Sequence, residues 1–154
     1  MPPIIDYIKV SFCKIIIKTY SYIKNYSELM LTVEKWKSVI NSNRRLVENG
    51  RWINMTFTFG IEDKDYLFHI INGKVQSIDE RSVLTKSGVF KIHGKIKVWD
   101  KHWLELPPRD YHDIFSMLAK NLISIDGDLT PFIQNLQYFK DLIASYRKIK
   151  NEYA

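Results

Sequence analysis

His112 and the two acids beside it are the residues whose types could support proton transfer. His112 is followed by Asp113 and preceded by Asp110, whereas the other three histidines are scattered along the chain. An imidazole near two carboxylates can act as a general acid or base. Adjacent residues on a helix diverge, however, so His112 and Asp113 cannot easily serve one reaction. We favour helix capping and surface contacts for this cluster, and a small enzyme using His112 is the lesser alternative.

A row of basic residues lies between positions 89 and 99. Every second residue from position 91 is basic or aromatic, namely Lys91, His93, Lys95, Lys97 and Trp99. On a strand this spacing would place charge and an aromatic ring on one face. Proteins that bind single-stranded nucleic acid use such surfaces. The sequence contains no RNP-like motif, and a solvated sheet face explains the row more simply. We therefore expect no nucleic-acid partner.

The motifs of several enzyme classes are missing from the sequence. It has no glycine-rich phosphate loop, no paired Cys and His at zinc spacing and no nucleophile elbow. The single cysteine, Cys13, excludes a disulfide framework and a cysteine-based metal cluster. We predict a protein that is not an enzyme, with no catalytic residue, no metal and no cofactor.

The composition is that of one globular domain. The 154 residues are 45% hydrophobic and 26% charged, which excludes a disordered chain. The net charge of +6 permits an anionic membrane surface as a partner without requiring one.

Residues 1–26 form a separate unit in the sequence pattern. Apolar residues recur at helical spacing, and Lys14, Lys18 and Lys24 lie towards the other side. The segment fits a helix packed on the body of the protein, a membrane-surface helix, a mobile extension, or a start codon assigned upstream of Met30. Its internal charges argue against both a membrane span and a secretory signal. We expect a cytoplasmic protein with this N-terminal unit and a main domain over 27–154.

The rest of the chain alternates between strand and helix patterns. The expected elements are a helix over 28–48 capped by Ser27, strands over 52–59, 66–71, 74–78 and 89–99, a helix over 109–121, a strand over 122–126, and a last helix starting at Thr130-Pro131. Asn72-Gly73 predicts a tight hairpin. Gly94 leaves a gap on an apolar strand face, which indicates a bulge or, second, a close approach to the backbone. The order predicts an α+β fold with one mostly antiparallel sheet of five strands and helices on one face.

The final third resembles the sterol carrier protein type-two family. The resemblance rests on Asn121–Asp128 running into Pro131–Leu136, where a short strand ends in a Gly-Asp turn before a helix with a leucine after an Asn. Pro107-Pro108 and His112–Met117 are similar to a bacterial and archaeal branch of that family, and Asn72–Val75 matches its second hairpin turn. The similarity covers about 28–148, and residues 1–26 have no counterpart in it.

The resemblance implies a hydrophobic tunnel between sheet and helices that binds a fatty acyl chain, a sterol or another elongated lipid. Independently of the resemblance, the lysines of residues 1–26 suggest transient membrane contact through that segment. The expected lining residues are Phe57, Phe59, Phe68, Ile70, Phe90, Ile92, Phe115, Leu118, Phe132, Leu136 and Phe139. The alternative is a non-catalytic accessory or scaffold domain whose core is filled and which acts through protein partners, because natural interiors usually close to crystal-like density.

Overall fold

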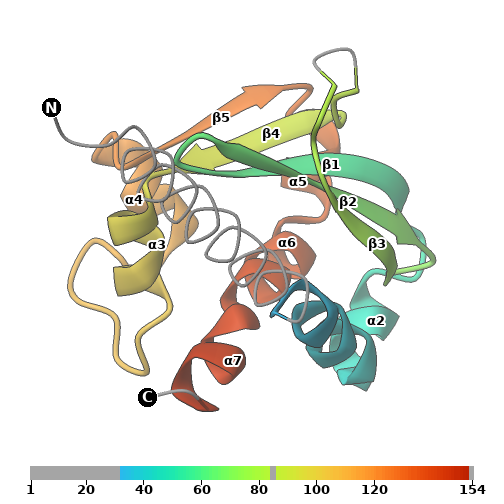
Figure 1. Ribbon diagram of the computed structural model, residues 1–154, viewed down its shortest axis with the longest axis horizontal. Coiled ribbons are helices and arrows are strands. Elements are labelled where there is room, and N and C mark those ends of the chain that lie inside the picture. Colours follow the sequence, from blue (N-terminus) through green and yellow to red (C-terminus); the bar gives the residue numbers. More distant parts are fainter. Residues whose placement is uncertain (1–31, 84–85, 153–154) are drawn as a thin grey trace, which may run out of the picture. The chain divides into compact units, whose positions relative to one another are not determined.

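The computed structural model describes residues 32–83 and 86–152 (Figure 1). The chain divides into two compact units, Met1–Glu34 and Lys35–Ala154. Only residues 32–34 of the first unit are described, and they are helical. The helix expected over 1–26 and the Ser27 cap therefore lie outside the described residues, and the following description concerns the second unit. No helix in its described part is long and apolar enough to cross a membrane.

A five-stranded sheet forms the centre of the second unit. Its strands are β1 (Asn54–Ile61), β2 (Lys64–Ile71), β3 (Lys74–Glu80), β4 (Phe90–Gly94) and β5 (Ile123–Gly127). They lie in the order β3-β2-β1-β4-β5. The β1–β4 pair is parallel and the other three pairs are antiparallel. This confirms the expected α+β fold with one mostly antiparallel sheet.

The hairpin between β2 and β3 follows from its two turn residues. Asn72 and Gly73 have φ angles of +52° and +75°, which glycine adopts freely and asparagine tolerates. The Asn72 amide also donates to Asn54 Oδ1 at 2.9 Å, which joins the turn to the start of β1. The prediction of a tight hairpin at this dipeptide is confirmed.

Helices cover one face of the sheet (Figure 1). Residues 35–42 are helical, and they are followed by α2 (Arg44–Asn49), α3 (Ile96–His102), α4 (Ile114–Ala119), α5 (Thr130–Gln134), α6 (Leu136–Ala144) and α7 (Tyr146–Glu152). The single helix expected over 28–48 is interrupted at Asn43, whose side-chain oxygen accepts from the Leu46 amide and starts α2 as a new helix. The last helix is likewise divided into α5, α6 and α7.

The prediction of a strand over 89–99 is wrong beyond Gly94, where β4 ends. The chain turns there into α3, and the Glu62 side chain accepts from the Ile96 amide at 3.0 Å in its first turn. The side chain of Trp99 is fully buried, and its indole N–H donates to the Gly60 carbonyl. Lys95 and Lys97 therefore do not continue the strand face of Lys91, and the row that suggested nucleic-acid binding does not form.

Gly94 is a point of close approach and not a bulge. It keeps regular register with Ile61 and Ile123 on its two neighbouring strands. A Cβ atom at this position would lie 2.9 Å from Trp99 Nε1. The gap that the sequence suggested on the apolar face is filled by the tryptophan of α3.

Candidate functional site

The inward face of the sheet is a continuous apolar layer. Alternate residues of β1, β2 and β4 point towards the helices, so their side chains are removed from water. Eight of the eleven residues expected to line a tunnel are at most 1% exposed, namely Phe57, Phe59, Phe68, Ile70, Phe90, Ile92, Phe132 and Phe139. The structure thus brings strand and helix members of the expected set into one layer.

Phe57 is at the centre of this layer, which we call the phenylalanine cluster. Its ring centroid lies 5.0 Å from Phe68, 5.3 Å from Phe90 and 5.3 Å from Phe139. Phe132 joins through Phe90 at 5.4 Å. These separations are contact distances for aromatic rings. Around Phe57, the rings themselves occupy the space between sheet and α6.

A second aromatic group lies beside the first and was not predicted from the sequence. Trp36, Phe59, Trp99, Trp103 and Tyr146 form it, with Trp103 and Tyr146 centroids 4.2 Å apart. The indole N–H groups donate at 2.9–3.2 Å to the Ser145 hydroxyl and to backbone carbonyls. The spacing of Trp99 and Trp103, one helical turn apart, was the signal that could have revealed it.

The apolar layer reaches the surface at α4 and α5. Phe115 is 40% exposed and Ile133 is 60% exposed, while Leu118 and Leu136 are half-buried. The Phe115 ring lies 6.4 Å from that of Phe132, which connects this edge to the phenylalanine cluster. The three remaining predicted lining residues, Phe115, Leu118 and Leu136, therefore lie at the border of the layer and not inside it.

Asp113 fixes the start of α4. Its carboxylate accepts from the Phe115 amide at 3.0 Å and forms an ion pair with Lys140 of α6. Burial alone would raise the pKa of this carboxyl group, but the hydrogen bond and charge of Lys140, together with the helix amides, hold the pKa below its usual value. His112 is exposed. The acid therefore serves as a helix cap, and the His112 cluster forms no shared proton-transfer site.

His102 is a second titratable group, buried at the end of α3. Its Nδ1 lies 2.7 Å from the Tyr111 carbonyl, which can only accept, so Nδ1 carries the proton. Nε2 is buried without a partner. Burial lowers the pKa of His102, and the charge of Arg147 lowers it further. The imidazole is consequently neutral near neutral pH.

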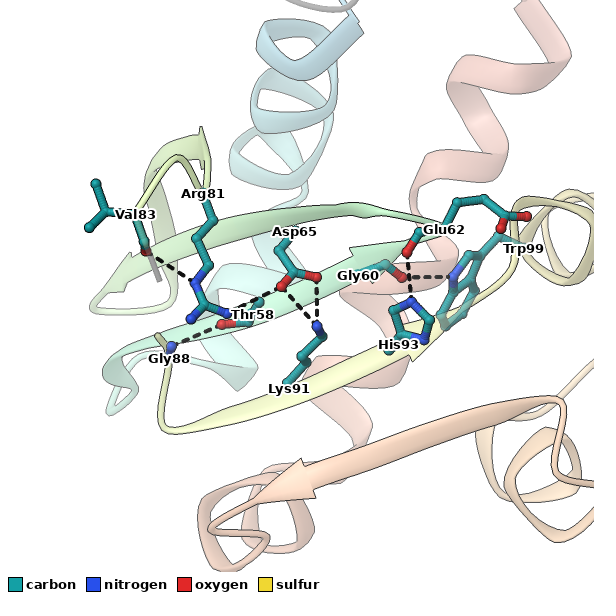
Figure 2. Close-up of polar contacts among 10 residues, drawn as sticks. All are labelled: Thr58, Gly60, Glu62, Asp65, Arg81, Val83, Gly88, Lys91, His93 and Trp99. Atoms are coloured by element: carbon teal, nitrogen blue, oxygen red, sulfur yellow. Dashed lines mark hydrogen bonds and ion pairs between the residues drawn. The ribbon is translucent and has the colours of Figure 1, made fainter. Parts of the chain in front are cut away.

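The opposite, open face of the sheet carries a polar network (Figure 2). The Asp65 carboxylate accepts from Lys91 at 2.8 Å and from Arg81 at 3.2 Å. Thr58, which is 1% exposed, accepts from the Gly88 amide at 2.9 Å. These bonds attach the chain that connects β3 to β4 onto the open face. Nowhere in the described part of the chain do three or more acidic, histidine or cysteine side chains gather as a metal site would need.

Comparison with solved structures shows which known fold this chain shares. No family model and no curated protein sequence matches this chain. Among solved structures, a crystal structure of sterol carrier protein 2 superposes with a TM-score of 0.62 at 9% identity, covering 76% of this chain and 94% of that one. A conserved hypothetical protein from Thermus thermophilus, described as possibly a sterol carrier protein, gives 0.57 at 11% identity, over 77% and 86% of the two chains. The ubiquinone synthesis protein UbiJ-SCP2 gives 0.50 at 11% identity, over 74% and 86%. At these identities the likeness concerns the fold, and the chain has the fold of sterol carrier protein 2 domains.

Proposed function

We propose that this domain binds an elongated apolar ligand, such as a fatty acyl chain or a sterol-like lipid, between the inward face of the sheet and helices α4, α5 and α6. The observation that carries the proposal is an apolar layer that runs from the phenylalanine cluster to the surface at α4 and α5, within a sterol carrier protein 2 fold. We propose that the eleven side chains expected from the sequence to line the tunnel contact this ligand.

Entry of the ligand requires movement, because the rings around Phe57 are in mutual contact. Helices α4 and α5 are six and five residues long. Helices this short have little stability of their own and depend on packing. We propose that they move away from β5, which would expose the buried Phe132, beside the already exposed Phe115, to an incoming chain.

Affinity and selectivity would follow from the apolar nature of the lining. Each methylene transferred from water contributes about 0.8 kcal/mol. One methylene more or less discriminates weakly between ligands, so chain-length specificity should be broad. The proposal includes no chemical step and assigns no catalytic residue.

Ligand uptake can be measured with native mass spectrometry after gentle purification and with a fluorescent fatty acid. Leu118→Trp places a larger side chain at the border of the layer and should reduce probe affinity. Ile71→Trp is the control, because Ile71 is 40% exposed on the open face of the sheet. The proposal fails if no lipid co-purifies and the unmodified protein takes up no probe.

The ring contacts around Phe57 favour a second candidate, a non-catalytic accessory domain with a filled core. Such a domain would act through a protein partner and take up no lipid. A reproducible, stoichiometric partner recovered with the full chain, together with failure of both lipid assays, would support this alternative.

We further propose that residues 1–26 contact membranes transiently and that the protein acts in the cytoplasm. Both proposals rest on the sequence, with its lysine-bearing apolar segment and single cysteine. Flotation with anionic liposomes, with and without residues 1–26, tests the contact, and equal flotation of the two forms would contradict it.

A further inference from the structure

A polar cleft lies on the open face of the sheet, away from the apolar layer. Its volume is about 370 Å³, which is within the range of small-molecule sites. The residues around it are Thr56, Leu67, His69, Ser77, Asp79, Lys86 and Ser87. Those on β1, β2 and β3 alternate with the inward-facing apolar residues, so the cleft and the proposed lipid site are on opposite sides of the sheet.

The crossing chain that forms one wall of the cleft is attached to β1 by specific bonds. Gly88 donates to the Thr58 hydroxyl, and the Val89 amide donates to the Thr56 carbonyl at 2.8 Å. Only glycine fits at position 88, because a Cβ atom there would lie 2.4 Å from the Phe57 Cα. Figure 2 shows the bond between Gly88 and Thr58, and Lys86 and Ser87 directly precede this attachment point in the chain.

Some of the polar groups of the cleft form hydrogen bonds with one another. Ser77 donates to one carboxylate oxygen of Asp79 at 2.7 Å, and the Thr56 hydroxyl lies 2.8 Å from His69 Nδ1. Among the described residues, Lys86 and Asp79 take part in no ion pair, with each other or with a third group. The cleft thus presents one cation and one anion, and no ion pair among the described residues neutralises either charge.

The two charges are on different walls. Asp79 is on β3, whereas Lys86 is two residues from the bond that holds Gly88 to β1. Strands β1 and β3 are two strand spacings apart, about 9–10 Å. A ligand with a single charge would meet attraction on one side and repulsion on the other. A ligand with opposite charges at its two ends meets attraction on both.

We propose that this cleft binds a small zwitterion whose ammonium group contacts Asp79 and whose phosphate or carboxylate contacts Lys86. The Ser87 hydroxyl and the His69 imidazole supply further hydrogen bonds near the anionic end, and Leu67 lies beneath the linker between the two charges. The ligand is either a free metabolite or the headgroup of a zwitterionic phospholipid, since both present the same chemistry.

The test is a titration of the full-length protein with phosphoethanolamine, followed by NMR at His69 and by calorimetry. Asp79→Asn and Lys86→Gln should each weaken binding about two- to fivefold, the range of exposed charge pairs. Lys120→Gln, which removes an exposed cation at the end of α4, is the control and should leave binding unchanged. Inorganic phosphate and ethanolamine, each carrying one of the two charges, should bind more weakly than phosphoethanolamine.

The signs of the two variant effects decide the outcome. If Asp79→Asn strengthens binding, the site takes a simple anion, and if Lys86→Gln strengthens it, the site takes a cation. Either result overturns the proposal, as does the absence of any His69 shift at millimolar phosphoethanolamine. Vesicles of phosphatidylethanolamine that bind the unmodified protein, and lose binding in both variants, would identify the headgroup as the source. Uptake of the fluorescent fatty acid should be the same in all variants, which separates this cleft from the lipid proposal.

Discussion

Replacing Gly94 by alanine tests directly whether the apolar layer is closed beside Trp99. Gly94 is the last residue of β4, between β1 and β5, and its backbone conformation is one that alanine can adopt. If the position were open, the substitution would stabilise the protein by about 0.4–1 kcal/mol, because it reduces the entropy of the unfolded chain. The structure predicts the opposite sign.

The magnitude follows from the atoms that a methyl group would meet. The new Cβ would lie 2.9 Å from Trp99 Nε1 and 2.9 Å from Ile123 Cγ2. Neither neighbour can retreat easily, since both are buried and the indole donates to Gly60 at 3.2 Å. Overpacking of this kind costs about 1–3 kcal/mol, and a weakened indole hydrogen bond costs about 1 kcal/mol more. After the smaller entropic gain is subtracted, the net loss should be about 1–3 kcal/mol.

Urea unfolding followed by circular dichroism measures this difference, with thermal unfolding as a second readout. Gly94→Ala combined with Trp99→Phe should lose less stability than the sum of the two single changes, because the smaller ring gives the methyl group space. A Gly94→Ala protein that is as stable as the unmodified protein, or more stable, would refute the close packing and would leave a void beside α3.

Three further changes test other contacts. Thr58→Val leaves the Gly88 amide without its acceptor and should cost about 1–3 kcal/mol in urea unfolding. Asp113→Asn loses the Lys140 ion pair and should cost about 1 kcal/mol near neutral pH. Because the folded-state pKa of Asp113 is below 3.8, this difference should shrink as the pH falls below about 4. The folded-state pKa of His102 is below 6.5, so acidification protonates the unfolded chain first and stability falls below that pH. His102→Asn should reduce this fall.

Each of these three results has a clear contrary outcome. Thr56→Val is the control for Thr58→Val, since among the described residues the Thr56 hydroxyl bonds only the exposed His69. Equal losses would show that the Gly88 bond is unimportant. A difference for Asp113→Asn that persists at pH values of about 2 would exclude the charge as its origin. A pH profile that is the same with and without His102 would mean that another group controls acid sensitivity.

The strand alternation predicted most of the inward-facing layer, because one residue in two must face the helices wherever one side of a sheet is buried. The same rule failed after Gly94. In the sequence, Ile96 and Val98 continue the alternation of apolar and polar residues. In the structure, however, the Glu62 side chain accepts a hydrogen bond from the Ile96 amide, and the burial of Trp99 favours a helix. These are contacts with residues more than thirty positions away, which no local pattern contains.

The polar cleft could not be predicted for a related reason. Thr56, His69 and Asp79 are outward residues of three strands, and the hairpins indicate that they are neighbours. The remaining side of the cleft is formed by the chain that leads from β3 to β4 and contains Lys86. Its position depends on β4 pairing in parallel with β1. The sequence order of strands does not contain that information.

The parallel position of β4 also has a kinetic consequence. The three strands β1, β2 and β3 are joined by two tight turns and can pair through local contacts. The Gly88–Thr58 bond that brings β4 to β1 joins residues 30 positions apart, so a larger loop must close before that bond is formed. We expect the three-stranded hairpin unit to form early and the arrival of β4 to limit the folding rate. Changes at Asn72-Gly73 should therefore slow refolding, whereas changes in β5, which among the described strands pairs only with β4, should mainly accelerate unfolding.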